Sequence, residues 1–198
     1  MEIDPEKLLQ VNLEASIVAK QEMITSGEIL LSFKQAAEAV LQSYKKGGRL
    51  YIAGNGGSAA DAQHLAAEFV SKLTNDRAPL PAEALTVDTS ILTAIGNDYG
   101  YEKVFSRQIE GKMQKDDVFL AFTTSGDSIN ILEGLKTCQS LGLTSVAFSG
   151  RGGGLAKSLA DYCVVVPGST TATIQELHIV LAHTLCGYIE SRILGADT

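Results

Sequence analysis

The stretch LYIAGNGGSAADAQHLAAE, residues 50–68, joins a short apolar run to a glycine-rich turn and then to a helical pattern. A strand-length apolar run that ends in glycines and leads directly into a helix is typical of a β–α unit in a parallel sheet. The glycines of GNGGS (54–58) let a ligand approach the backbone, and the start of the following helix presents free amides to an anion. The motif alone fits a plain turn equally well, because Asn-Gly is a common turn sequence.

The rest of the chain repeats this alternation. Residues 5–46 favour two helices separated by Ser26-Gly27. Helical patterns follow near 58–74, 101–114, 128–141, 152–160 and 171–193, and the runs expected to form strands are LYIAG (50–54), EALTV (83–87), DVFLAFTT (117–124), TSVAFSG (144–150) and YCVVVP (162–167). These patterns predict an α/β fold, a three-layer αβα sandwich in which helices cover both faces of a mostly parallel, five-stranded sheet. A flavodoxin-like strand order is an assumption at this point. We expect one domain over residues 1–198, with N-terminal helices in 1–48 and the α/β core in 49–198.

A second loop of the same kind follows the third expected strand. TTSGDS (123–128) carries the hydroxyls of Thr123, Thr124, Ser125 and Ser128, which suit a dianionic phosphate monoester. If the strand order is 2-1-3-4-5, strands 1 and 3 flank the topological switch point, where ligands of such sheets bind. Both loops would then face one crevice. The sequence therefore predicts a phosphate site there.

A dinucleotide site is the main competing interpretation of the first loop. Gly54, Gly56 and Ala59 satisfy the G-x-G-x-x-G/A pattern, and Asp88 ends the second expected strand. However, Asp88 lies about 30 residues past the loop, whereas the dinucleotide pattern expects an acid about 20 residues on. The hydroxyl-rich second loop is also unnecessary for a pyrophosphate. A Gly-Lys-Ser/Thr loop is absent from the sequence, which excludes a P-loop NTPase.

Composition narrows the function classes. Apolar residues make up 45% and charged residues 20% of the chain, and the formal charge of −7 argues against a nucleic-acid-binding surface. The cysteines, Cys138, Cys163 and Cys186, have neither zinc-ribbon nor redox-motif spacing, so we expect buried thiols. The N-terminus lacks the apolar segment of a signal peptide, and the sequence has no apolar run of membrane-spanning length. We therefore expect a cytoplasmic protein with neither nucleic acid nor membrane as a partner.

Histidines and carboxylates give a second signal. His64 and Glu68 lie four residues apart on the helix that GNGGS opens, so they share a face. For an isolated pair, a buried histidine bonded to a glutamate would be a sufficient explanation. The other two histidines, His178 and His183, lie with Gln175 on a helix that is apolar on most sides, where polar groups are costly unless paired.

Gln175 and His183 cannot easily hold one metal from the same helix. Eight residues apart, they point within about 80° of each other but lie about 12 Å apart along the axis. One solution is that they serve sites in neighbouring subunits, so that the site lies at an interface. His178 points to another side of the helix, and we interpret it as a packing or supporting residue.

Four segments together resemble the bacterial phosphoheptose isomerase family of the sugar isomerase (SIS) fold: GNGGSAADAQH…E, TAIGNDYG, TTSGDS and IQELH…H. The likeness spans nearly the whole chain. It implies an isomerase that converts D-sedoheptulose 7-phosphate to D-glycero-D-manno-heptose 7-phosphate through an enediol, in the synthesis of ADP-heptose for the lipopolysaccharide core. It also implies one zinc ion per active site and a homotetramer that uses the N-terminal helices and has active sites between subunits.

The resemblance also implies roles for individual residues. The expected catalytic residues are Glu68 and His183. The expected zinc ligands are His64, Glu68, Gln175 and His183. The expected substrate-binding residues are Asn55, Gly56, Gly57, Ser58, Glu68, Asn97, Asp98, Thr123, Thr124, Ser125, Ser128 and Gln175. The family pattern departs at Ala172 and Lys72, where some members carry an acid and an arginine, so roles of those two positions do not transfer.

The residue types suit this chemistry. Ketose–aldose isomerisation moves a proton between C1 and C2, which requires a base at carbon and an acid at the neighbouring oxygen. We expect Glu68 to be the base and His183 the acid, and a bound metal would polarise the carbonyl. Glutamine is an uncommon zinc ligand, which indicates a site of modest affinity. A metal-bound carboxylate is a weaker base, so whether Glu68 does both jobs stays open.

Two rivals share the fold class. One is a non-catalytic binding protein resembling the DnaA initiator-associating protein, which lacks the family's catalytic glutamate and second histidine. This chain has both Glu68 and His183, which favours the enzyme. The other rival, a sugar-phosphate-sensing transcription regulator, would need a DNA-binding module for which the chain is too short.

Overall fold

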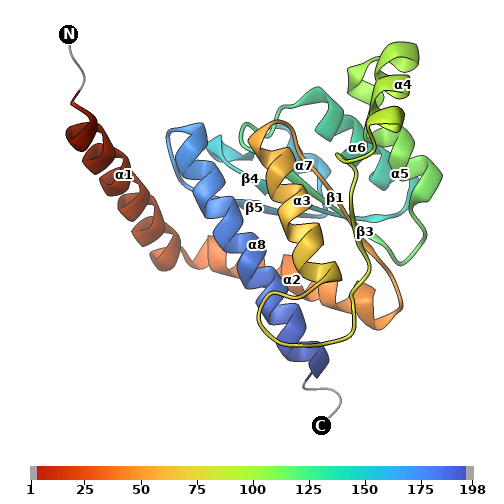
Figure 1. Ribbon diagram of the computed structural model, residues 1–198, viewed down its shortest axis with the longest axis horizontal. Helices are drawn as coiled ribbons and strands as arrows, with labels where there is room; N and C mark the ends of the chain where they lie inside the picture. The colour runs from red at the N-terminus through yellow and green to blue at the C-terminus, as the bar shows by residue number, and fades with distance from the viewer. Residues whose placement is uncertain (1–3, 195–198) are drawn as a thin grey trace.

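The computed structural model describes residues 4–194, and its central layer is a parallel sheet (Figure 1). The strands are β1 (Leu50–Ala53), β2 (Ala82–Ala84), β3 (Val118–Thr123), β4 (Thr144–Ser149) and β5 (Tyr162–Val165). All neighbouring strands are parallel, and their order is β2-β1-β3-β4-β5. This is the predicted flavodoxin-like order, and it places β1 beside β3 at the switch point.

Helices cover both faces of the sheet, which confirms the three-layer sandwich. One face carries α2 (Gly27–Lys45), α3 (Gly57–Val70) and α8 (Thr171–Leu194), and the other carries α5 (Ser106–Lys112), α6 (Ile129–Leu141) and α7 (Ala156–Leu159). The remaining helices are α1 (Pro5–Thr25), α4 (Thr89–Tyr99) and the 3-10 turns η1 (Tyr101–Lys103) and η2 (Arg151–Gly153). Helix α1 extends away from the sheet (Figure 1), whereas α2 packs against β5 and α8.

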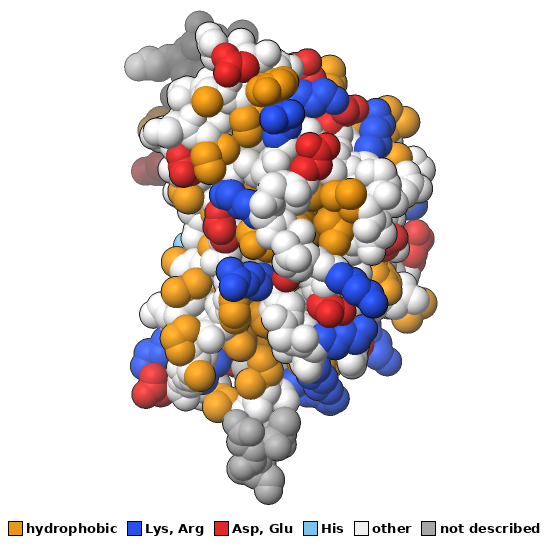
Figure 2. All heavy atoms as spheres, turned by 90° about the vertical axis from the view of Figure 1, so that its right-hand side faces the viewer, with side chains coloured by type: hydrophobic (Ala, Val, Ile, Leu, Met, Phe, Trp, Pro, Cys, Tyr) orange, Lys and Arg blue, Asp and Glu red, His pale blue; other side chains and the backbone are white. Residues whose placement is uncertain are grey.

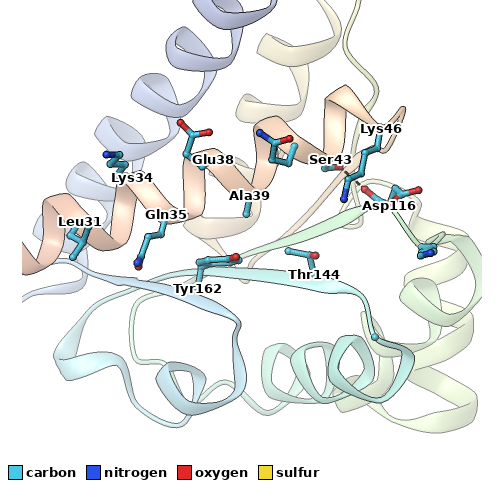
Figure 3. Close-up of a pocket in the computed structure, with 13 residues that line it drawn as sticks. Leu31, Lys34, Gln35, Glu38, Ala39, Ser43, Lys46, Asp116, Thr144 and Tyr162 are labelled. Carbon is cyan, nitrogen blue, oxygen red and sulfur yellow. Dashed lines mark hydrogen bonds between the residues drawn. The ribbon is translucent and has the colours of Figure 1, made fainter.

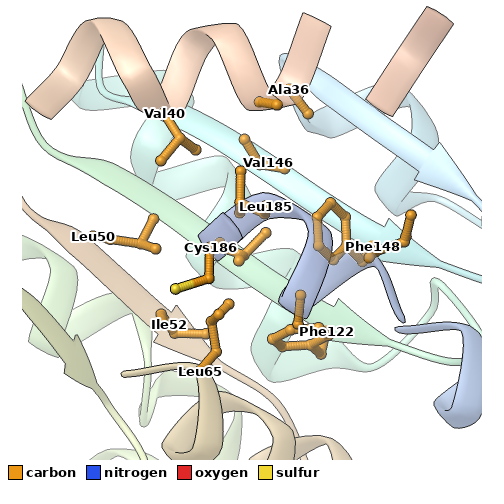
Figure 4. Packing of buried hydrophobic residues seen from close by; sticks show 14 of the residues in the cluster. Ala36, Val40, Leu50, Ile52, Leu65, Phe122, Val146, Phe148, Leu185 and Cys186 are labelled. Carbon is orange, nitrogen blue, oxygen red and sulfur yellow. The ribbon is translucent and has the colours of Figure 1, made fainter. Parts of the chain in front are cut away.

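Alternating strand residues supply two separate cores. Ile52 and Phe122 point to the face that carries α3 and α8 (Figure 4), while Phe119 and Ala147 point to the opposite face. These side chains are essentially inaccessible to solvent. Because each buried face needs its own helices, the near-continuous apolar strands of the sequence fit a sheet covered on both sides.

The region after β2 differs from the sequence prediction. The strand expected over 83–87 ends at Ala84, and the unpredicted helix α4 begins at Thr89. The carboxylate of Asp88 accepts a hydrogen bond of 2.9 Å from the Ile91 backbone N–H, so this residue caps α4. Leu92 and Ile95, at helical spacing, are partly buried against the core, but α4 has no fully buried residue and its apolar stripe is short.

Helices α3 and α8 lie side by side and run in the same direction (Figure 1). Near their start, the side-chain amide of Gln175 lies against Gly57. Further along, His183 contacts Glu68, and beyond the end of α3 the carboxylate of Glu190 accepts a hydrogen bond from the Leu73 backbone. This parallel pair carries the polar residues that the sequence singled out.

On the face shown in Figure 2, basic side chains are interspersed with acidic ones. Ion pairs such as Lys103–Glu133 and Lys112–Glu83 join residues of opposite charge. None of the helices described between residues 4 and 194 is long and apolar enough to cross a membrane.

All cysteines are free thiols. Two of the three, Cys138 and Cys186, are buried as expected, whereas Cys163 is partly exposed. Burial raises the pKa of Cys138 to about 12.

Candidate active site

The glycine-rich loop after β1 needs glycine at its first position. A side-chain Cβ at Gly54 would lie 2.4 Å from the backbone oxygen of Ser58, too close for any other residue without a backbone shift. Gly56 has φ of +58° and precedes α3 without a side-chain cap. The first amides of α3 are therefore free of a capping side chain, and Gly56 and Gly57 are exposed. This geometry suits an anion.

A network of amides fixes the shape of this loop. Asn55 donates to the Oδ1 of Asn130 over 2.9 Å, and Asn130 donates back to the Oδ1 of Asn55 over 2.8 Å. The hydroxyl of Tyr101 also donates to Asn55, at 3.0 Å. Asn130 is buried at the start of α6, so it links the loop after β1 to the helix after β3. Asn130 and Tyr101 were not predicted, because they belong to none of the motifs that indicated phosphate binding.

The second loop follows β3 at the same edge of the sheet. The hydroxyl of Thr123 accepts from the Gly126 backbone N–H at 3.2 Å, and that of Ser125 accepts from the Asp127 backbone N–H at 3.1 Å. The hydroxyls of Thr124 and Ser128 form no hydrogen bond with any described residue, and Ser128 precedes the first turn of α6. Two hydroxyls thus shape the loop, and two are available to a ligand.

Asn97 and Asp98 lie on the last turn of α4, exposed, with the Asn97 amide donating to the Asp98 carboxylate at 2.7 Å. Tyr101, three residues beyond Asp98, reaches Asn55 of the first loop. The hydrogen bond of Tyr101 therefore links the end of the TAIGNDYG segment to the glycine-rich loop after β1. Asn97 and Asp98 themselves bond to each other.

Three of the four predicted metal ligands converge within this one chain. His64 Nε2 lies 2.9 Å from Glu68 Oε1, and His183 Nε2 lies 3.2 Å from the same oxygen. The two imidazole nitrogens are 3.1 Å apart. The histidine side chains are about half exposed, at 52% and 44%, whereas that of Glu68 is 11% exposed. The cluster therefore opens to solvent on the histidine side.

This cluster fits a zinc ion. Ligand atoms bound tetrahedrally at about 2.1 Å lie about 3.4 Å apart, a few tenths of an ångström more than the three separations in the cluster. Two imidazoles and a carboxylate are also a common donor set for zinc. In addition, Glu68 Oε2 is buried without a hydrogen-bond partner among the described residues. Since a buried unpaired carboxylate oxygen is costly, a nearby cation would stabilise it.

Within the same chain, Gln175 lies apart from the cluster of His64, Glu68 and His183. Its Nε2 would be 2.4 Å from a Cβ placed on Gly57, so its amide packs against the phosphate loop. His183 follows two helical turns later and joins His64 and Glu68. Within one chain the structure thus brings together three of the predicted ligands and places the fourth beside the predicted phosphate site.

Asp61 is a further polar residue on this helix face. Gly57, Asp61, His64 and Glu68 form one stripe of α3 at helical spacing. Asp61 Oδ2 is buried without a partner among residues 4–194, and burial raises the pKa of this carboxyl while His64 nearby partly offsets the rise. Sequence reasoning missed Asp61, although the i, i+3 spacing to His64 was a usable signal.

His178 packs beneath the sheet edge, in agreement with its predicted packing role. It is inaccessible to solvent, and its ring centroid lies 5.8 Å from that of Phe122. Neither ring nitrogen has a hydrogen-bond partner among the described side chains and backbone. Burial lowers the pKa of His178 to about 4, so the ring is neutral at physiological pH.

A groove of about 760 Å³ lies away from this site (Figure 3). It runs between α2 and the amino ends of the strands, with lining residues that include Lys34, Lys46, Asp116 and Tyr162. In parallel α/β sheets ligands bind at the carboxyl ends, where both loops and the His64 cluster lie. We therefore assign the candidate active site to the carboxyl edge of the sheet, because the two loops and the His64 cluster lie together there, and not to the groove beside α2.

The fold and the two loops define a class, the SIS domain. The sequence profile of the SIS domain family matches residues 15–150, and the chain belongs to this family. More particularly, it belongs to the phosphoheptose isomerases. It is 45% identical over 185 residues to a phosphoheptose isomerase of Aneurinibacillus thermoaerophilus, with 93% of each chain covered, and 50% identical over 173 residues to that of Burkholderia pseudomallei, with 87% and 88% covered.

Solved structures give the same family. A phosphoheptose isomerase from Neisseria gonorrhoeae is 40% identical with a TM-score of 0.88, covering 95% of this chain and 100% of that one. A second, from Francisella tularensis, is 34% identical with a TM-score of 0.90, covering 96% and 100%. The coverage extends well beyond the profile match at residue 150. These relatives support the isomerase interpretation and not the binding-protein alternative.

Proposed function

We propose that this chain isomerises D-sedoheptulose 7-phosphate to D-glycero-D-manno-heptose 7-phosphate, with a zinc ion at the His64–Glu68–His183 cluster. One observation carries the proposal. In a chain of the phosphoheptose isomerase family, an acid–base cluster lies two to three helical turns along α3 from a phosphate loop. The reaction places the enzyme in the synthesis of ADP-heptose for lipopolysaccharide, and we expect it to act in the cytoplasm.

The separation of the two ends suits a long sugar phosphate. His64 lies about 10 Å and Glu68 about 16 Å along the helix axis from Gly57. The phosphate binds the backbone N–H groups of Gly56 and Gly57, which donate to no described residue, and the hydroxyls of Thr124 and Ser128, while C1 and C2 reach the cluster. Asn97 and Asp98 bind sugar hydroxyls between these ends. A seven-carbon chain spans this distance more readily than a short one.

The proton transfers follow from the cluster. The Glu68 carboxylate takes a proton from C1 of the ketose, and His183 donates a proton to the oxygen at C2, which gives the enediol. Glu68 then returns its proton to C2 while the hydroxyl at C1 gives its proton to His183, so the aldehyde forms and both side chains regain their starting protonation states. Glu68 Oε1 lies 3.2 Å from His183 Nε2, so the proposed base and acid are side by side, as proton transfer at two neighbouring atoms requires.

Zinc at this cluster would be held by His64, Glu68 and His183, and when bound it polarises the substrate carbonyl. Gln175 lies at the phosphate end within its own chain, and we propose that its amide binds substrate there. Its role as a fourth zinc ligand requires a second subunit or a movement of the side chain.

We also propose a homotetramer whose interfaces complete the site. Helix α1 exposes large apolar residues at 50–71% of their area, among them Leu8, Leu9, Val11, Leu13, Ile17, Val18 and Ile24. Apolar residues on such a projecting helix are typical of a surface that packs against another subunit. The half-exposed His64 and His183 likewise leave room for a neighbouring subunit at the cluster.

The test is turnover by the purified protein. Sedoheptulose 7-phosphate is incubated with the protein, and the aldose product is followed by NMR with and without a chelator. We expect product that disappears on chelation and returns with zinc. Turnover that is unchanged after complete zinc removal would refute the zinc assignment, whereas the absence of product from a folded, zinc-loaded tetramer would refute the isomerase.

A further inference from the structure

A buried ion pair fastens the chain segment after α3 to α8. Arg77 Nε lies 3.1 Å from Glu190 Oε1, and the two side chains are 2% and 0% exposed. The Glu190 carboxylate also accepts from the backbone N–H groups of Leu73, Thr74 and Asn75, at 2.9, 3.3 and 3.4 Å. Burial by itself raises the pKa of Glu190, but these backbone bonds and Arg77 lower it overall, so the carboxylate is charged.

The same guanidinium holds the end of α3. Arg77 donates to the backbone oxygen of Glu68 at 2.9 Å and to that of Phe69 at 2.8 Å. These carbonyls belong to the last turn of α3, where backbone acceptors lose their partners within the helix. One side chain therefore contacts the backbone of the proposed base directly and α8 through Glu190.

Glu190 lies seven residues after His183 on α8, which places both on one face of that helix. Arg77 thus connects the helix that carries Glu68 to the helix that carries His183, two turns beyond their contact of 3.2 Å. A buried ion pair adds little net stability compared with apolar packing. The planar guanidinium group of Arg77, which bonds to both helices, does fix the distance between α3 and α8.

We propose that Arg77 and Glu190 are positioning residues that set the separation of Glu68 and His183, and hence both proton transfer and metal binding at the cluster. This inference rests on the proposed function. Neither residue contacts the cluster side chains. Their effect passes through the backbone of Glu68 and the register between α3 and α8.

Arg77→Lys tests the proposal, because lysine keeps the charge but cannot form the fork to Glu190 and two carbonyls. Glu190→Gln is the second variant, which keeps the size and one acceptor oxygen if Arg77→Lys fails to fold. The matched control is Leu135→Ala, a cavity in the core on the opposite face of the sheet, chosen to lower the melting temperature similarly.

We expect kcat of Arg77→Lys to fall by about 10- to 100-fold, as displacement of a catalytic group by about 1 Å does, with KM changed less than about threefold. The zinc dissociation constant, measured by competition with a chromophoric chelator, should rise about tenfold. Leu135→Ala should leave both unchanged. If Arg77→Lys or Glu190→Gln matches Leu135→Ala in kcat and in zinc affinity, the proposal is wrong. The zinc affinity is measured without turnover. If the wild type binds zinc but produces no aldose, the proposed function is wrong, while the effect of Arg77 and Glu190 on zinc binding is still tested.

Discussion

Replacing Glu68 by glutamine separates the effect of this carboxylate on protein stability from its roles in zinc binding and proton transfer. The substitution keeps the size of the side chain but removes the charge that lies 2.9 Å from His64 and 3.2 Å from His183. Without zinc, the wild-type carboxylate keeps one buried oxygen, Oε2, without a partner among the described residues. A neutral amide costs less to bury than a carboxylate, so zinc-free Glu68→Gln should be as stable as the wild type or more so.

Zinc should reverse that order. At a free zinc concentration 100 times the dissociation constant, binding stabilises the wild type by about 2.7 kcal/mol. For a chain of this size, that corresponds to a rise in melting temperature of about 5–10 °C. If loss of the carboxylate weakens binding about 100-fold, the same zinc concentration stabilises the variant by only about 0.4 kcal/mol.

The assay is thermal unfolding of both proteins with and without zinc, together with turnover of the ketose phosphate. We expect the variant to lose the zinc-dependent shift and at least about 10²-fold in kcat, the contribution of a positioned base. Glu133→Gln, which removes only the surface pairs with Lys103 and Lys136, is the control and should change neither. A full zinc shift in Glu68→Gln, or turnover at the wild-type rate, would refute the reasoning.

Further predictions concern the acid, the phosphate loop and the buried histidine. His183→Gln should lower kcat by at least about 10²-fold with little change in KM. A rise in KM with kcat unchanged would contradict the role of His183 as the acid. Gly54→Ala, whose methyl would meet the Ser58 backbone at 2.4 Å, should raise KM about tenfold, whereas Gly111→Ala, with open space around it, should not. The pKa of His178 is lowered to about 4, so the unfolded state gains a proton between pH 6.5 and 4 that the folded state does not. Stability should therefore fall by up to about 3 kcal/mol as the pH drops through that window, and denaturant titrations of His178→Leu should show a smaller fall.

Local patterns predicted the fold well. Buried strands appear in the sequence as continuous apolar runs, and the strand order assumed for the loops after β1 and β3 agrees with the structure. Helix α4 was not predicted, although Leu92 and Ile95 stand at helical spacing and pack against the core. A stripe of so few apolar residues is too short to predict a helix by periodicity alone.

The site was only partly predictable for the same physical reason. His64 and Glu68 are neighbours in sequence, so helical spacing alone placed them together. The contact of His183 with Glu68, by contrast, depends on the register between α3 and α8, which no local pattern encodes. The Arg77–Glu190 pair joins residues 113 positions apart and carried no motif. Long-range packing therefore sets the details of the cluster.

Direct observation of the reaction tests the central claim. Purified, zinc-loaded protein is mixed with sedoheptulose 7-phosphate, and NMR follows the C1 signals of ketose and aldose, with Glu68→Gln in parallel. The account predicts formation of the aldose heptose 7-phosphate by the wild type, loss of activity with chelator, and no turnover above background by the variant. Absence of aldose from a folded wild type, or equal turnover by Glu68→Gln, would contradict it.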